Sequence, residues 1–379
     1  MMAADTYAPD INGAARFAER FAVGLVSRGH EVHMIAPSPT GEPGRERLNG
    51  VLVHRMRSHR YPTVADFHIC LPWEVTGRIK QIVHKFRPDV AHVQAHFVCG
   101  RYLAKHASDA GVPLVATNHF MPENLVGHLP LPKAAKDWVK HMAWQDLAKV
   151  YGLANYVTAP TPRATTLLEA AAGIYGAEPI SCGIDGAPYE AARAASRTNK
   201  KPTILFVGRL DEEKRVDELI KAVAKLPDPE AVKLEIVGDG SCASKWRSLS
   251  DELGLSSVTT FHGFVDEEEL VDLYGRADIF VMPGIAELQS LATLEAMCAS
   301  TPVICANAMA LPHLCQSGNN GFLFEPGKID QLSAHILTLV SDSDLRARFG
   351  EHSRNIAEDH AIGKTLDRFE EIYATVIEG

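Results

Sequence analysis

Short runs of consecutive apolar residues recur along the chain, and each one ends at or near glycine, proline, asparagine or threonine. They include VPLVATNHF, NYVTAPT, KPTILFVGRL, KLEIVGDG, ADIFVMPG and TPVICAN. Uninterrupted apolar runs of this length are typical of strands that are buried on both faces of a parallel sheet, and the segments between them have helical periodicity. Strands that alternate with helices predict an α/β fold.

A break in this pattern divides the chain into two predicted domains, residues 1–180 and 181–379. The segment from about 179 to 200 holds proline, glycine, small and basic residues without a clear period, and a new apolar strand follows it. The last segment, 357–379, predicts a helix, because one face of it is apolar: Ile362, Leu366, Phe369, Ile372, Tyr373 and Val376.

Composition indicates a soluble globular protein. Of the 379 residues, 46% are hydrophobic and 22% are charged, no apolar run approaches the length of a membrane span, and the start MMAADTYAPD lacks the features of a signal peptide. The seven cysteines are scattered and never spaced as C-x-x-C, which favours neither a zinc site nor a disulfide framework. A reducing, cytoplasmic location is therefore expected.

Charge is distributed unevenly between the two halves. Residues 1–180 carry 19 basic and 15 acidic side chains (net +4), whereas the remainder carries 19 and 32 (net −13). This asymmetry suggests that the first domain meets an anionic or membrane-bound partner, although ordinary variation between two surfaces explains it equally well.

Two glutamates carry the strongest chemical signal. Glu287 and Glu295 stand eight residues apart in PGIAELQSLATLEAM, directly after the strand ADIFVMP. A helix that starts at the carboxyl end of a parallel strand offers N–H groups and a dipole to an anion such as a diphosphate. Taken alone, such a pair is more often a helix-start charge and a solvated face.

Two cations follow the strand TILFVG. Arg209 closes this strand and Lys214 begins the next helix, so both are expected at the strand-end crevice, where they would neutralise a diphosphate. The alternative is a pair of surface cations beside Asp211, Glu212 and Glu213. Gly13 also has two interpretations. A glycine lets the backbone approach a ligand closely, but it also suits a plain turn after Asn12.

These motifs together resemble the retaining glycosyltransferases of family four, which have the GT-B fold. The resemblance covers nearly the whole chain, from TYAPDINGAARFAERFAVGLVSRGHEVHMIAP through FRPDVAHVQAH and VPLVATNHF to FVGRLDEEKRVDELIKA, LEIVGDGS, HGFVDEEELVDLYGRADIFVMPG and the glutamate pair. It implies two Rossmann-like domains that face each other across a deep cleft, with an acceptor-binding first domain, a donor-binding second domain and a C-terminal helix that packs back on the first.

The resemblance also implies roles for individual residues. Glu287 contacts the donor sugar, His119 lies next to the transferred sugar, and Glu295 binds the ribose hydroxyls. The remaining donor-binding positions are Gly13, Arg209, Lys214, Phe264, Leu288, Gln289, Ser290 and Leu291. The co-substrate is a UDP- or GDP-linked sugar, and neither a metal, another cofactor nor a nucleic-acid partner is expected. Asp342-Ser343-Asp344 has the form of a metal-binding D-x-D string, but its place between two helical patterns predicts a helix cap.

The implied reaction is transfer of a hexose to an acceptor hydroxyl, with front-face attack assisted by the leaving diphosphate. A membrane lipid is one candidate acceptor, because LPKAAKDWVKHMAWQDLAKVY interleaves lysines with Trp138, Met142 and Trp144 as an interfacial helix would. The enzyme would then sit at the inner face of the membrane. A core-facing tryptophan stripe and a soluble acceptor are the alternative, and an epimerase or a non-catalytic sugar-binding relative would share the fold.

Three positions depart from the family pattern. The chain supplies only the end of the expected first strand, which questions the stability of the first sheet. Ser300 stands where glycine usually precedes Thr-Pro, and His313 stands where an acidic residue is common. Because the second substitution touches a loop near the donor, the donor sugar does not follow from the resemblance.

Overall fold

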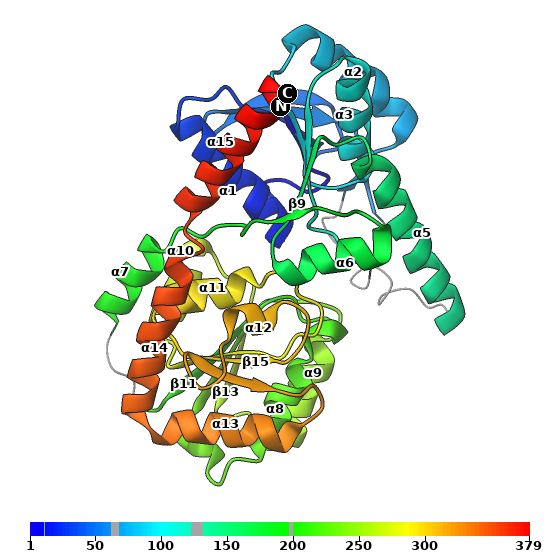
Figure 1. Ribbon diagram of the computed structural model, residues 1–379. Coiled ribbons are helices and arrows are strands. Elements are labelled where there is room, and N and C mark those ends of the chain that lie inside the picture. Colours follow the sequence, from blue (N-terminus) through cyan, green and yellow to red (C-terminus); the bar gives the residue numbers. More distant parts are fainter. Residues whose placement is uncertain (11, 62–67, 123–131, 197–199) are drawn as a thin grey trace. The chain divides into compact units, whose positions relative to one another are not determined.

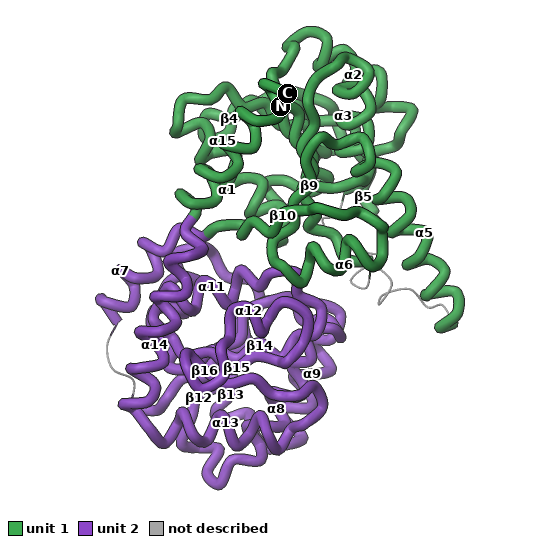
Figure 2. The backbone as a smooth tube through the Cα atoms, in the orientation of Figure 1, with its two compact units in different colours: residues 1–183, 362–379 green, residues 184–361 purple. Residues whose placement is uncertain are grey.

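The computed structural model describes residues 1–10, 12–61, 68–122, 132–196 and 200–379. It divides into two compact units, which Figure 2 shows in different colours. Unit 1 comprises residues 1–183 and 362–379, and unit 2 comprises residues 184–361. Among the described residues, no helix is both long and apolar enough to cross a bilayer.

Unit 1 is built on an eight-stranded sheet with the order β10-β9-β8-β7-β1-β2-β4-β3. Its neighbouring strands are parallel, except that β3 runs antiparallel to β4. The strands are β1 (Met2–Ala3), β2 (His33–Pro37), β3 (Gly44–Leu48), β4 (Val51–Met56), β7 (Ala91–Val93), β8 (Leu114–Thr117), β9 (Tyr156–Ala159) and β10 (Glu178–Pro179), and a separate hairpin is formed by β5 (His59–Arg60) and β6 (His68–Ile69). The two residues of β1 are buried and pair with both β2 and β7.

The described helices of unit 1 include the C-terminal one. They are α1 (Gly13–Ser27), α2 (Pro72–Phe86), α3 (Val98–Asp109), α5 (Lys133–Tyr151), α6 (Pro162–Ala172) and α15 (Ile362–Glu378). Helix α15 lies beside α1 (Figure 1), where Arg28 pairs with Asp367 and Glu370 at 2.6 and 2.5 Å. The rings of Phe21 and Phe369 meet edge to face at 4.8 Å, so α15 completes the core of this unit.

Unit 2 has a six-stranded, fully parallel sheet with the order β13-β12-β11-β14-β15-β16. The strands are β11 (Thr203–Val207), β12 (Lys233–Val237), β13 (Thr259–Gly263), β14 (Ile279–Met282), β15 (Val303–Ala306) and β16 (Gly321–Phe324). The helices are α7 (Ala187–Ala195), η1 (Glu212–Lys214), α8 (Val216–Ala224), η2 (Pro229–Ala231), α9 (Ala243–Glu252), α10 (Glu267–Arg276), α11 (Leu291–Cys298), α12 (Leu311–Leu314), α13 (Ile329–Ser341) and α14 (Ser343–Glu358).

The strand order of unit 2 reverses between β11 and β14. Strands β12 and β13 are added on one side of β11, whereas β14, β15 and β16 are added on the other. In open α/β sheets, ligands bind at the carboxyl ends of the strands where the order reverses, because the two following loops diverge there and leave a crevice. The loops after β11 and β14 hold Arg209, Lys214 and Glu287.

The predicted α/β fold is confirmed, and the six apolar runs form β8, β9, β11, β12, β14 and β15. Some of the other strands are shorter or more polar, and such runs do not mark them. Strand β3 has the sequence GRERL and lies at the sheet edge with mostly exposed residues, so no apolar run marks it. The C-terminal helix starts at Ile362, later than expected, because α14 continues to Glu358.

Candidate donor site and active-site residues

The loops that follow β11 and β14 are joined at the point where the strand order reverses. Lys214 Nζ donates to Glu287 Oε1, and the side chains of this ion pair are only 15% and 11% exposed. The backbone N–H of Ile285 also donates to the carbonyl oxygen of Glu213 at 2.9 Å. The structure therefore brings together two residues that the sequence singled out separately, 73 positions apart.

Glycines bring the neighbouring strand ends close together. Gly238, at the end of β12, has a φ of 121°, and a Cβ there would lie 2.0 Å from the carbonyl oxygen of Gly208. Only glycine fits such an approach without moving the backbone. The VGDG motif thus packs the β12 loop against the β11 loop that carries Arg209.

Arg209 is held by carboxylates. Its side chain is 50% exposed and pairs with Asp211 at 2.5 Å and Glu213 at 2.7 Å. Asp211 is buried and also accepts hydrogen bonds from the backbone N–H and hydroxyl of Ser241, at 3.0 and 2.7 Å. These are the contacts of a surface cation beside carboxylates, so Arg209 could bind a phosphate only by giving up one of these ion pairs. Sequence reasoning missed Asp211 as the residue that orients Arg209.

The segment from Glu287 to Leu291 leads into helix α11. Ser290 caps the helix, since its Oγ accepts from the N–H of Thr293 at 3.3 Å. The carbonyl oxygen of Glu287 accepts from the N–H of Ala310 at 3.1 Å, and Leu288 is buried, which anchors the loop. The first N–H groups of a helix have no partner inside the helix, so this turn can present them to an anion.

Glu295 lies inside α11 and is 3% exposed. Its Oε2 accepts a hydrogen bond from the hydroxyl of Tyr274 in α10 at 2.8 Å. Tyr274 is itself fully buried beside Tyr189. Sequence reasoning missed Tyr274, because nothing in the sequence of α10 shows that its hydroxyl meets a carboxylate 21 residues further along.

Two other residues predicted to bind the donor are Phe264 and Gln289. Phe264 follows β13 and is 72% exposed, so its ring is available to stack on a ligand. Gln289 lies with its amide nitrogen 3.4 Å from Nδ1 of His360, and the His360 ring meets that of His313 at 5.5 Å. His313, which stands where the family commonly has an acidic residue, therefore contacts His360, and His360 contacts Gln289 in the loop before α11.

His119 follows β8 in unit 1 and contacts the side chains of Phe17, Gln94 and Cys182. Its ring packs against Phe17 at 4.6 Å, its Nε2 lies 2.9 Å from Gln94 Oε1, and its Nδ1 lies 3.8 Å from Cys182 Sγ. Burial lowers the pKa of His119 to about 4, so the ring is neutral at physiological pH. A neutral ring with both nitrogens facing protein groups is poorly suited to general acid–base catalysis.

Gly13 is the first residue of α1 and is exposed. The preceding Asn12 caps the helix, because its Oδ1 accepts from the N–H of Ala15 at 2.9 Å. Gly13 therefore stands at a helix start, where a small residue keeps the first turn accessible.

The two tryptophans of the predicted interfacial segment both lie on helix α5 but differ in exposure. Trp144 is buried, whereas Trp138 is 65% exposed and Met142 is 40% exposed. Lys133 is exposed in the same half of the helix, and Lys140 lies 3.7 Å from Asp137. Trp144 therefore faces the core, as the alternative interpretation predicts. Among the described residues of this segment, Trp138 and Met142 are the two large apolar residues that are exposed.

The D-x-D string caps a helix. Asp342 Oδ1 accepts from the N–H of Leu345 at 2.8 Å, so Asp342 is the N-cap of α14. This is the structural role that its position between two helical patterns predicts.

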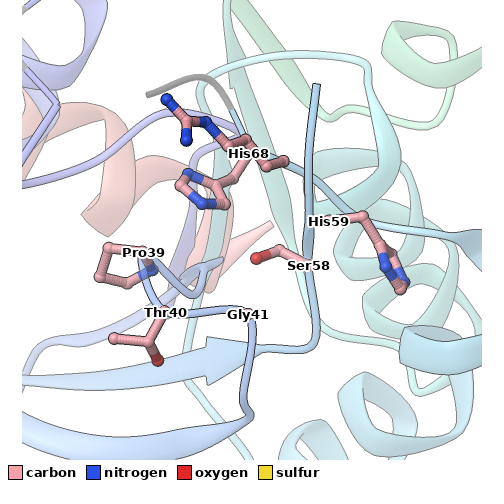
Figure 3. A pocket seen from close by; sticks show the side chains of 7 residues that line it. Pro39, Thr40, Gly41, Ser58, His59 and His68 are labelled. Carbon is pink, nitrogen blue, oxygen red and sulfur yellow. The ribbon is translucent and has the colours of Figure 1, made fainter. Parts of the chain in front are cut away.

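A pocket of about 630 Å³ lies in unit 1 beyond the carboxyl ends of β2 and β4. It is lined by Pro39, Thr40, Gly41, Ser58, His59, Arg60 and His68. Figure 3 shows the His68 ring and the Ser58 side chain on the side of Pro39, whereas His59 points away from them. Ser58 ties the two loops together, since its Oγ donates to the Ser38 carbonyl oxygen at 2.5 Å and its N–H donates to that of Gly41 at 3.1 Å. Sequence reasoning missed this pocket.

Models of known protein families match both halves of the chain. The model of Glycosyltransferase Family 4 matches residues 11–187, and that of Glycosyl transferases group 1 matches residues 189–356. A GDP-mannose-dependent alpha-mannosyltransferase of Mycobacterium tuberculosis is 30% identical over 338 residues, which cover 86% of this chain and 84% of that protein.

Solved structures share the fold over the whole chain. Sucrose-phosphate synthase from Thermosynechococcus elongatus has a TM-score of 0.83 at 19% identity, and covers 100% of this chain and 98% of its own. Anabaena HepE in complex with UDP-glucose has a TM-score of 0.78 at 18% identity, and covers 99% of this chain and 98% of its own. The two units thus define a GT-B glycosyltransferase. The chain belongs to glycosyltransferase family four, and it is a hexosyltransferase.

Proposed function

We propose that the protein is a retaining glycosyltransferase that moves a hexose from a nucleoside diphosphate sugar to an acceptor hydroxyl. The observation that carries this proposal is the meeting of Lys214 and Glu287 at the carboxyl ends of β11 and β14, next to the start of α11. A cation, a carboxylate and helix N–H groups at one crevice match the diphosphate and the sugar hydroxyls of such a donor.

Each group has a proposed task in donor binding. The diphosphate takes the negative charge when its bond to the sugar breaks. This charge would be neutralised by Lys214, Arg209 and the first N–H groups of α11. Glu295 would accept hydrogen bonds from the ribose hydroxyls, and Phe264 would stack on the base. Glu287 would hold the sugar hydroxyls, with its charge balanced by Lys214.

GDP-mannose is the first donor to test, followed by UDP-glucose. The Mycobacterium tuberculosis relative is named as a GDP-mannose-dependent mannosyltransferase, and Anabaena HepE is named in complex with UDP-glucose. Release of free GDP or UDP would be measured with each donor, with and without a candidate acceptor. Turnover of one donor would support the proposal, and failure to release either nucleotide across a panel of donors and acceptors would oppose it.

The proposed chemistry needs no covalent enzyme intermediate. The acceptor hydroxyl attacks the anomeric carbon on the face that the diphosphate leaves, the diphosphate oxygen takes the hydroxyl proton, and the configuration is retained. His119 would contribute as a neutral group beside the sugar, since burial holds its pKa at about 4. Catalysis would come from positioning and charge stabilisation, so we expect a chelator to leave the activity intact.

Unit 1 is proposed to bind the acceptor, and a membrane lipid is the candidate that the exposed surface of α5 favours. Trp138 and Met142 are exposed one turn apart, with Lys133 nearby on the same helix. Aromatic and basic side chains in this arrangement suit a membrane interface, where anionic lipids attract lysines. The protein would then act at the inner membrane surface as a peripheral enzyme.

A soluble sugar or polyol acceptor is the second candidate, because the pocket beyond β2 and β4 is large enough for one and is lined by polar side chains. Sedimentation with anionic vesicles separates the two. If the acceptor is a lipid, we expect binding to the vesicles that weakens with salt and falls in Trp138→Ser. Tyr175→Ser removes another exposed aromatic residue and should leave the binding unchanged. Absence of wild-type binding at low salt, together with turnover on soluble acceptors, would favour the second candidate.

A further inference from the structure

A chain of hydrogen bonds runs from helix α15 to His119 inside unit 1. The Tyr373 hydroxyl lies 2.6 Å from His92 Nδ1, and His92 Nε2 lies 2.7 Å from Thr117 Oγ1 and 3.3 Å from Gln94 Nε2. Gln94 Oε1 completes the chain at 2.9 Å from His119 Nε2. Tyr373, His92 and Gln94 are all buried, so water does not compete for these bonds.

The chemistry of each link determines where the ring protons lie. Both histidines are neutral, because burial lowers the pKa of His119 to about 4 and that of His92 well below its ordinary value. An amide nitrogen only donates, so Nε2 of His92 accepts from the Gln94 amide and shares its lone pair with the Thr117 hydroxyl at 2.7 Å, while its Nδ1 carries the proton and donates to the Tyr373 hydroxyl. An amide oxygen only accepts, so the proton of His119 is on Nε2, and its bare Nδ1 faces Cys182.

The backbone holds Gln94 rigidly in place. It directly follows β7, and its N–H donates to the carbonyl oxygen of Ala3 in β1 at 2.9 Å. His119 follows β8, the parallel neighbour of β7, so both side chains leave the same edge of the sheet. An amide fixed at both its oxygen and its nitrogen allows one orientation of the His119 ring.

We propose that Gln94 is a positioning residue for His119, which it holds in a single tautomer and orientation through its bond to Nε2. The functional part rests on the proposed role of His119 beside the transferred sugar. His92 and Tyr373 act one step further away by fixing the direction of the Gln94 amide. A residue that acts in this way affects the transfer step more than substrate binding.

Gln94→Met tests this role, because methionine has a similar shape but neither donates nor accepts at the amide position. Side-chain ¹⁵N spectra of histidine-labelled protein report the tautomer directly, and the His119→Gln variant assigns the signal. We expect wild-type His119 to be protonated at Nε2 alone and Gln94→Met to show a mixture. With GDP-mannose or UDP-glucose as donor, kcat should fall about tenfold with little change in KM, the order of one lost buried hydrogen bond.

Two further variants separate positioning from a general loss of structure. Gln94→Glu keeps an oxygen towards His119 Nε2 and should retain the tautomer, with a kcat nearer the wild-type value than that of Gln94→Met. Gln145→Met removes a Gln–His contact of 2.8 Å on the exposed face of α5 and should change neither readout.

Either of two results would overturn the proposal: a wild-type tautomer in Gln94→Met, or an altered tautomer with unchanged kcat. If the wild-type protein turns over no donor, the proposed function fails, and with it the catalytic part of this inference. The NMR measurement still decides whether Gln94 orients His119.

Discussion

Lys214 and Glu287 are the residues on which the proposed donor site depends most. Each was chosen from the sequence because it follows a strand, but their contact joins positions 73 residues apart and depends on β11 and β14 being neighbours. Sequence spacing does not contain that adjacency. The same holds for Tyr274 beside Glu295 and for Gln94 beside His119, whose partners come from other elements.

Replacing Lys214 by methionine should lower kcat by about two orders of magnitude, because one preorganised charge opposite the leaving diphosphate is lost. Lys221→Met is the matched control, since Lys221 pairs with Asp217 at 2.7 Å on α8 and is 44% exposed. The measurement is the rate of nucleotide release for the two variants. Equal rates would contradict the role of Lys214.

Replacing Glu295 and replacing Glu287 should change different quantities, namely nucleotide affinity and kcat. Glu295→Gln should weaken nucleoside diphosphate binding about tenfold, because ribose hydroxyls lose a charged acceptor, while Glu287→Gln should mainly lower kcat. Calorimetric titration with GDP and UDP measures the first effect, and steady-state kinetics measures the second. Unchanged binding in Glu295→Gln would remove that residue from the site.

At the scale of elements, prediction from sequence succeeded where strands are buried on both faces. Strands β11 and β14 have uninterrupted apolar sequences and central places in the sheet, so the apolar run alone identifies them. The β5–β6 hairpin failed this test, because its strands are two residues long and are partly or fully exposed. The pocket that it lines was missed for the same reason.

Ser300, which departs from the family pattern, follows the last residues of helix α11. Ser300 has a φ of 53°, a left-handed conformation that costs a residue with a Cβ more than it costs glycine. Ser300→Gly should therefore stabilise unit 2 by about 0.5 to 1 kcal/mol, measured as a higher unfolding midpoint in denaturant. A lower midpoint would show that the serine side chain contributes a contact worth more than the strain.

Among the described residues, burial lowers the pKa of six histidines in unit 1 and of two in unit 2, His313 and His335. In unit 1, desolvation lowers the pKa values of His54, His96 and His119 to about 4. A lowered pKa means that the unfolded chain binds protons more readily, so the stability from neutral burial is present above about pH 6.5 and is lost as the pH falls towards 4. At pH 4, each of these histidines lowers the free energy of unfolding by about 2 to 3 kcal/mol relative to its value above pH 6.5. Asp5 opposes them, since burial raises its pKa to about 6 and favours the protonated folded form.

Unit 1 should therefore lose structure at a higher pH than unit 2 during acidification. Hydrogen exchange measured by peptide between pH 7 and pH 4 tests this, with β7 and β8 reporting on unit 1 and β11 and β12 on unit 2. We expect the unit 1 strands to lose protection first. Simultaneous loss, or earlier loss in unit 2, would show that the histidines do not govern acid stability.

For the molecule as a whole, the central claim is that the loops at the carboxyl ends of β11 and β14 bind a nucleoside diphosphate sugar for transfer. The most direct measurement is calorimetric titration of GDP, UDP and their sugar conjugates into the wild-type protein and into Lys214→Met and Lys221→Met. We predict saturable binding of at least one nucleotide by the wild type and Lys221→Met, and clearly weaker binding by Lys214→Met. Absence of binding by the wild type, or equal binding by all three proteins, would contradict it.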